Sequence, residues 1–294
     1  MPAMRYNTTG PWFKGNTHIH TTASDGGTAA GDLARMYAGQ GYRFLFRTDH
    51  WVVSRHDDET ASAPLLWLHG VELDGFDHGG SPYHVVCLGS LHGLSREMGF
   101  VAAMELARAQ GGLLILAHPF WSGNSIEDAL RWGFHGVETY NHVCRWLNGK
   151  SNGFVYWTNM LARDKDTLSL AVDDAHVRPE HPGWNGGWIM VNAPDCTPPA
   201  LMAGIRAGEY YSSCGPDFLS IQSDATHVRI RTSPVQFIRL VGPGWLGRRY
   251  GSFDRAVLTE AEFEIPADWP YAYLEIEDQA GRLAWTNCLF RSEP

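Results

Sequence analysis

The sequence predicts an α/β protein in which a mostly parallel sheet or barrel is followed by a small antiparallel β-domain. Two observations carry this prediction. Over about the first 175 residues, short apolar runs typical of strands alternate with helical stretches, which is the pattern of βα units. After about residue 213, short runs of alternating polar and apolar residues take over, and Gly and Pro punctuate them as turns.

The expected elements of the first part can be read in order along the chain. Strands or apolar runs are predicted at residues 15–20, 43–48, 65–73, 83–88, 113–117, 136–140 and 167–172. Helices are predicted at residues 28–39, 96–110 and 153–163, and another begins at Ser125, which forms a capping-box pattern with Asp128. The run at 113–117 is continuously apolar, which indicates a strand buried on both faces.

These patterns divide the chain into a barrel over residues 1–213 and a β-rich C-terminal appendage over residues 214–294. In the appendage, alternation is clearest at residues 228–231, 237–240 and 271–276. A unit of about 80 residues lies within the usual range of domain sizes.

Composition narrows the class of protein. A formal net charge of -9 argues against broad binding to nucleic acid or to a membrane surface, because both need a basic face. An anionic substrate stays possible, since bound divalent cations reverse the local field. Five widely spaced cysteines suggest reduced thiols, and neither a signal peptide nor a membrane-spanning run is visible. We therefore expect a cytoplasmic protein.

Histidines are concentrated where the strands end. Of the 14 histidines, all but His227 lie between His18 and His181. His18 and His20 are two residues apart on a predicted strand and so point to one face, and Asp174 and His176 repeat that spacing. In a parallel barrel, such strand ends meet on one rim. A single histidine is more often a hydrogen-bonded or surface residue, but the ordered set of imidazoles and carboxylates predicts a site for Zn, Mn or Fe.

Seven short motifs in this set occur in the order typical of one known family. They lie at residues 17–21, 24–26, 48–50, 70–72, 83–84, 117–119 and 174–176. Over about residues 12–213 the sequence resembles the PHP (polymerase and histidinol phosphatase) family. Residues 118–121 and 209–216, with the β-rich tail around 284–287, resemble its CehA/McbA-type metallohydrolase branch.

The resemblance implies a distorted (β/α)7 barrel of PHP type with two or three divalent metal ions at its C-terminal rim. The implied ligands are His18, His20, Asp25, His50, Glu72, His84, His118, Asp174 and His176. His18, His20 and Asp174 would hold one metal, and Glu72 would bridge to a second metal held by His84 and His118. Asp25, His50 and His176 would hold a third metal or, in its absence, protonate the leaving group as catalytic residues.

The expected function is a metal-dependent hydrolase, foremost a phosphoesterase that uses a metal-activated water on a small phosphate mono- or diester. This chemistry requires no serine or cysteine nucleophile. Two alternatives stay open, namely hydrolysis of a carbamate, carboxylic ester or amide, and metal-dependent binding without turnover. The expected partner is a small anionic ester. We expect no binding to a membrane and none to nucleic acid, apart from a nucleotide as substrate. The sequence does not set the oligomeric state.

Residues around the ligands have two interpretations each. The predicted substrate contacts are Arg47, Arg145, Arg178 and Trp121. The alternative for Arg47 is an internal ion pair, for Arg145 and Arg178 a position on the solvated surface, and for Trp121 a packing role. The same choice applies to Lys14, Arg55, His56, Trp51 and Trp184. Glu138 is either a ligand or a residue that orients one, and we favour the latter. Asp173 should face away from Asp174 and have a structural role.

Overall fold

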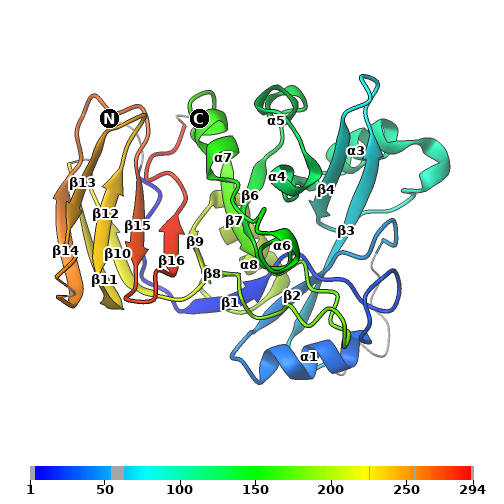
Figure 1. Ribbon diagram of the computed structural model, residues 1–294, viewed down its shortest axis with the longest axis horizontal. Coiled ribbons are helices and arrows are strands. Elements are labelled where there is room, and N and C mark those ends of the chain that lie inside the picture. Colours follow the sequence, from blue (N-terminus) through cyan, green and yellow to red (C-terminus); the bar gives the residue numbers. More distant parts are fainter. Residues whose placement is uncertain (1–3, 54–62, 225, 255, 293–294) are drawn as a thin grey trace.

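The computed structural model describes residues 4–53, 63–224, 226–254 and 256–292, with the elements drawn in Figure 1. The first part contains β1 (Trp12–Asn16), α1 (Ala30–Ala38), β2 (Phe44–Arg47), β3 (Leu66–Phe76), β4 (Pro82–Leu88), the 3-10 helix η1 (Arg96–Met98), α3 (Phe100–Ala109), β5 (Leu113–Leu116), α4 (Pro119–Ser122), α5 (Ile126–Arg131), β6 (Gly136–Asn141), α6 (His142–Asn148), α7 (Phe154–Leu161), β7 (Leu168–Val172), β8 (Trp188–Asn192), α8 (Pro198–Ala207) and β9 (Tyr210–Ser213). The tail adds β10 (Phe218–Ser223), β11 (His227–Val235), β12 (Phe237–Val241), β13 (Gly247–Tyr250), β14 (Leu258–Glu264), β15 (Tyr273–Glu277) and β16 (Leu283–Thr286).

The strands β1 to β7 lie side by side in chain order within a sheet of 13 strands. β1, β2 and β3 are parallel to one another, and so are β5, β6 and β7. β4 is the exception, because it runs antiparallel to both neighbours. Only residues 77–81 separate it from β3, and a connection this short permits a hairpin but not a parallel crossover.

The two ends of this arrangement meet just beyond β1 and β7. Residues 17–20, predicted as part of the first strand, lie beyond its end at Asn16, and Ile19 forms an isolated parallel bridge with Ala175. The N–H of His20 donates to the carbonyl of Ala175, and the N–H of Asp174 donates to the carbonyl of His18, both at 3.0 Å. Within the described residues, this bridge, rather than a continuous strand ladder, joins the two ends of the arrangement.

The tail is attached to the first part through a shared sheet and shared packing. β16 pairs antiparallel with β9, so the 13-stranded sheet continues into the tail, while β10, β11 and β14 form a separate three-stranded sheet. Figure 1 shows these tail strands at one end of the molecule and β4 with α3 at the other. The ring of Phe154 packs on Trp285 and that of Trp157 on Tyr273, with centroids 4.9 and 4.8 Å apart. The domain boundary at 213/214 stays a prediction.

The helices are short, and local signals fix where several of them begin or end. α5 starts with the predicted capping box: the N–H of Asp128 donates to Oγ of Ser125 at 3.1 Å, and the N–H of Ser125 donates to the Asp128 carboxylate at 2.8 Å. Gly149 and Gly208 end α6 and α8 in the left-handed conformation that favours glycine. No helix in the described part of the chain has the length and hydropathy needed to cross a membrane.

Candidate metal centre

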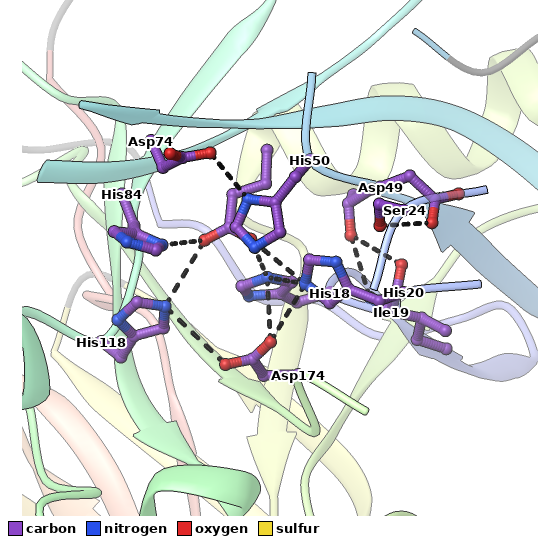
Figure 2. Close-up of polar contacts among 12 residues, drawn as sticks. His18, Ile19, His20, Ser24, Asp49, His50, Asp74, His84, His118 and Asp174 are labelled. Atoms are coloured by element: carbon purple, nitrogen blue, oxygen red, sulfur yellow. Dashed lines mark hydrogen bonds and ion pairs between the residues drawn. The ribbon is translucent and has the colours of Figure 1, made fainter. Parts of the chain in front are cut away.

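The nine predicted ligands converge on one site, and Figure 2 shows six of them by label. Eight of them lie on or directly after six of the strands, and Asp25 lies in the loop before α1. Their positions are His18 and His20 after β1, Asp25 before α1, His50 after β2, Glu72 on β3, His84 on β4, His118 after β5, and Asp174 and His176 after β7. Residues far apart in the sequence thus share one site.

The most deeply buried group consists of His18, His20, Glu72 and Asp174. Nε2 of His18 lies 3.0 Å from Nε2 of His20. Each of these nitrogens lies 3.1 Å from Glu72 Oε2 and 3.2 Å from Asp174 Oδ1. Ligand atoms of one tetrahedral ion with bonds near 2.1 Å are separated by roughly 3.4 Å, so these four atoms fit around a single cation.

The two oxygens of Glu72 face different sets of imidazoles. Besides the two nitrogens of the first group, Oε2 lies 3.3 Å from Nε2 of His50. Oε1 lies 2.8 Å from Nδ1 of His84 and 3.4 Å from Nε2 of His118. A carboxylate placed in this way is suited to bridging two metal ions.

A further group lies nearer the solvent and combines His20, Asp25, His50 and His176. Asp25 Oδ2 is 3.1 Å from Nε2 of His176 and 4.0 Å from Nε2 of His50, and Asp25 Oδ1 is 3.4 Å from Nδ1 of His20. This His20 nitrogen is buried and has no hydrogen-bond partner among the described residues. An orphaned imidazole nitrogen beside a carboxylate is the pattern expected where a cation is the missing partner.

The structural groups resemble the partition implied by the motifs but differ in detail. His18, His20 and Asp174 occur together with Glu72 added, and Asp25, His50 and His176 occur together with His20 added. The third group holds His50, Glu72 and His84. Among the described residues, His118 belongs to none of these groups, although Nε2 lies 3.7 Å from Asp174 Oδ2 as well as near Glu72. The assignment of ligands to individual metals stays a prediction.

The electrostatics of the cluster call for positive charge. Burial disfavours protonation of His18, but the carboxylates of Asp174, Glu72 and Glu138 outweigh it and raise its pKa well above the usual range. Burial likewise opposes protonation of His20, yet hydrogen bonds to Asp174 and Glu72 raise its pKa to about 9. Burial acts to raise the pKa of Glu72 and of Asp174, but nearby histidines hold both well below the usual range. Divalent cations would supply the same charge and displace these protons.

Glu138 orients the cluster from behind, as favoured from the sequence. One of its oxygens lies 2.6 Å from Nδ1 of His18, and the other accepts from the N–H of His118 and from Nδ2 of Asn141, both at 2.9 Å. Asn141 Nδ2 also donates to Asp174 at 3.2 Å. A carboxylate on the far nitrogen of a ligating imidazole fixes its tautomer and leaves Nε2 available for a metal.

Replacing Glu138 by glutamine should therefore weaken metal binding while the fold is retained. We expect a loss of about 10- to 100-fold in affinity, the usual effect of removing a partner that orients a metal ligand. Competition with a chelator of known affinity measures this loss. Glu127→Gln is the matched control, because Glu127 is an exposed residue of α5. Equal affinity in the two variants would show that Glu138 does not support the ligands.

Asp49 holds the loop that carries Asp25. Its buried carboxylate accepts from the N–H and Oγ1 of Thr21 at 2.7 and 2.8 Å and from Oγ of Ser24 at 2.8 Å. Nε of Arg47 lies 2.9 Å from Oδ2 of the same carboxylate. The internal ion pair expected as the alternative for Arg47 is thus present.

The backbone is also unusual at this site. Four described non-glycine residues have positive φ, namely Trp51, His118, Asp174 and Asn185. Two of them are candidate ligands, and Trp51 follows His50 directly. Such left-handed conformations cost energy in residues with side chains and cluster at functional sites.

The other predicted substrate contacts lie at different distances from the cluster. Trp121 stands edge-on to His118 and His84, with ring centroids 5.1 and 6.0 Å apart. Arg178 donates to the backbone carbonyl of Asp25 at 3.1 Å. Arg145 lies on α6 and lines a separate cavity to which none of the nine ligands contributes.

Three further candidates are placed as follows. Lys14 lies over the rings of Tyr42 and Trp188, 4.1 and 3.9 Å from their centroids, on β1 before the rim. Trp184 packs on Tyr37 with centroids 5.2 Å apart. Arg55 and His56 lie outside the described residues.

Sequence reasoning missed two residues, Asp74 and Arg96. Nδ1 of His50 lies 3.0 Å from Asp74, whose two oxygens accept from the Arg96 guanidinium at 3.0 and 3.1 Å. The two residues line a cavity of about 450 Å³ with Ser24, Asp25, His50 and His84. Asp74 is two residues after Glu72 on β3, so strand alternation could have placed it on the same face. No pattern in the sequence marks Arg96.

Comparison with known proteins supports the fold. No family model and no curated protein matches the chain. A two-domain protein from Bacteroides vulgatus, described as containing a predicted PHP-like metal-dependent phosphoesterase, superposes with a TM-score of 0.56 at 14% identity, covering 98% of this chain and 97% of that one. The chain therefore shares its overall fold, over nearly its full length, with a PHP-like protein.

Two other solved structures match less of the chain. A proposed metal-dependent phosphoesterase from Bifidobacterium adolescentis has a TM-score of 0.42 at 15% identity, covering 58% of this chain and 91% of that one. An amidohydrolase from Chromobacterium violaceum with bound sulfate has a TM-score of 0.41 at 16% identity, covering 65% of this chain and 96% of that one.

Proposed function

We propose that this protein is a metal-dependent hydrolase of the PHP family and that its substrate is a small phosphate mono- or diester. The observation that carries the proposal is the convergence of nine imidazole and carboxylate side chains, with the two oxygens of Glu72 shared between two sets of histidines. Two or three ions of Zn, Mn or Fe would be held by these residues. When bound, such ions supply Lewis acidity and a water acidic enough to attack near neutral pH.

The residues of the chain have distinct tasks in this proposal. Glu138 sets the orientation of His18, and Asp49 fixes the loop that presents Asp25. The pair formed by Asp25 and His176 lies on the solvent side, where it can deliver a proton to the leaving group if it does not hold a metal.

The charge of the site favours an anionic ester. Two carboxylates close to the cluster are already paired with arginines, Asp74 with Arg96 and Asp49 with Arg47. With three divalent ions bound, the positive charge would exceed the negative charge of Asp25, Glu72, Asp174 and Glu138, whereas two ions would balance it. A centre with excess positive charge binds a phosphate ester better than it binds a neutral amide.

A second candidate function is hydrolysis of a carbamate, carboxylic ester or amide, as in the CehA/McbA-type branch that the sequence resembles. The observation in its favour is an aromatic side chain at the centre: Trp121 is 37% exposed and touches two candidate ligands. Among the described residues that line the cavity, Arg96 is the single arginine or lysine.

The test is an assay of purified protein loaded separately with Mn, Zn and Fe, with metal content verified. The panel comprises phosphate monoesters, phosphate diesters, aryl carbamates, carboxylic esters and amides. Turnover of phosphate esters supports the proposal, and turnover of carbamates, esters or amides alone would replace it by the second candidate. Metal-loaded protein inactive on every class would indicate a binding module without turnover.

Arg96 is the cation best placed to meet an anionic ester, so we predict that Arg96→Met raises KM for a phosphate ester by roughly 10-fold. This is the effect expected from losing one partly exposed hydrogen bond to a charged group, and kcat should change little. Steady-state kinetics measure both parameters. Arg35→Met is a matched control, since Arg35 is an exposed arginine of α1 paired with Asp32. Equal KM values for the two variants would exclude substrate contact by Arg96.

A further inference from the structure

A second cavity of about 570 Å³ lies between the first part of the chain and the tail. β6, α6 and the start of α7 contribute to one side, and the β15–β16 turn with β16 contributes to the other. None of the nine candidate metal ligands lines it. Its volume lies within the usual range for small-molecule sites, roughly 300–1,000 Å³, and such sites often lie where two packed units meet.

The charged side chains of this cavity are cationic. Arg145 and Arg282 line it, and no acidic residue is found among its described lining residues, although the chain as a whole has a net charge of -9. Arg282 pairs with Asp278 at 2.7 Å. Arg145, in contrast, has no carboxylate of a described residue within 4.0 Å. Arg145 is exposed, so its guanidinium is accessible at the cavity and free to pair with an external anion.

Polar groups gather beside Arg145. The Tyr140 hydroxyl lies 3.0 Å from Nδ1 of His142, and both residues line the cavity. Burial raises the pKa of the Tyr140 phenol, and a hydrogen bond from Arg145 acts against that rise. Arg145 and Tyr140 thus both line this part of the cavity.

Aromatic rings form another part of the wall. Phe154 and Trp285 pack at 60° with centroids 4.9 Å apart, and Nε1 of Trp285 donates to Oγ of Ser169 at 2.7 Å, which fixes the indole. Cys214 lines the same cavity, and its thiol donates to the carbonyl of Leu283 at 3.2 Å. Phe154, packed on the buried Trp285, would give a flat apolar group a rigid packing partner.

We propose that this cavity is a binding site for a small organic anion with an aromatic ring. The carboxylate or phosphate group of the ligand pairs with Arg145, and its ring packs against Phe154, which is held in place by the buried Trp285. The two features that recognise it are thus a cation without a protein counter-ion and a fixed aromatic wall. The proposal does not depend on the reaction at the metal centre, because the two sites share no lining residue.

The test uses phenylphosphonate and benzoate as probes, since neither is an ester that the metal centre could hydrolyse. The full-length, metal-loaded protein is alkylated with iodoacetamide, and peptide mass spectrometry follows Cys214 and Cys196 separately. Both thiols are partly buried, but only Cys214 lines the cavity. We expect the probes to slow alkylation of Cys214 at least about 10-fold when near saturation and to leave Cys196 unchanged. Benzyl alcohol, which lacks the anion, should give no protection.

Variants assign the effect to the cavity rather than to the metals. Arg145→Met should weaken protection by both probes about 10-fold, as expected for loss of a charge-assisted hydrogen bond, and Phe154→Ala should weaken it as well. In the Arg35→Met variant, the probes should protect Cys214 to the same extent as in the unmodified protein. Protection by one probe alone would support the site and identify its acid group. The proposal is overturned if neither probe protects Cys214, or if the probes protect Cys214 equally in the Arg145→Met and Arg35→Met variants.

Discussion

Replacing Asp174 by alanine is expected to abolish most of the metal binding and, with it, the hydrolysis of any substrate found for this protein. Asp174 contributes Oδ1 at 3.2 Å from Nε2 of both His18 and His20, and its Oδ2 faces His118. Loss of a partner that only orients a ligand costs about 10- to 100-fold in affinity or activity, so loss of the ligand itself should cost more than about 100-fold. His20→Ala should have the same effect, because two of the three groups of candidate ligands include His20.

Two measurements made on the same samples decide this prediction. Metal content per folded protein and the rate of hydrolysis should fall together in both variants. The matched controls are His92→Ala and Asp268→Ala, which remove the same types of side chain at exposed positions. Full activity in Asp174→Ala or His20→Ala would remove the argument for a metal centre. Loss of activity with unchanged metal content would leave the metal centre supported and would show that these residues have a role other than holding the metal.

Replacing the neighbouring Asp173 by alanine is expected to lower the free energy of unfolding by about 4 kcal/mol. The buried carboxylate accepts from the backbone N–H groups of Asn185, Gly186 and Gly187 at 2.8, 2.7 and 2.9 Å, and from the Tyr37 hydroxyl at 2.7 Å. Alanine would leave four donors without an acceptor, of which those of Gly187 and Tyr37 are buried, each at a cost of about 1–3 kcal/mol when nothing replaces the bond. Relaxation and entry of water keep the total nearer to 4 kcal/mol, a large share of the stability of a typical domain.

Urea unfolding of the metal-free protein measures this change without a contribution from bound ions. Tyr37→Phe removes one of the four donors and should cost about 1 kcal/mol, while Asp268→Ala should lie within about 0.5 kcal/mol of the unmodified protein. An Asp173→Ala variant as stable as Asp268→Ala would show that the carboxylate does not hold the loop before β8. The comparison separates two adjacent aspartates, one expected to serve stability and the other metal binding.

The sequence predicted those features that depend on neighbouring residues. Strand alternation predicted a structural role for Asp173, and Asp173 contacts Tyr37 whereas Asp174 contacts His18 and His20. The strand itself ends at Val172 and Asp174 has a positive φ, so the two side chains are separated by the turn after β7 and not by continued alternation. The capping box at Ser125 followed from a pattern only four residues long. The position of candidate ligands at strand ends was also local information, because it needed only the extent of each apolar run.

The sequence by itself thus determined an α/β chain with a β-rich tail and a set of imidazoles and carboxylates at its strand ends. The tertiary structure alone decided which of these atoms meet, because their distances depend on strand pairing between distant segments. The bridge from Ile19 to Ala175 sets the spacing of His18, His20 and Asp174, and no local pattern encodes it. The ion pair of Asp74 with Arg96, and the cavity that Arg145 shares with the tail, arise in the same way from packing between segments that the sequence keeps apart.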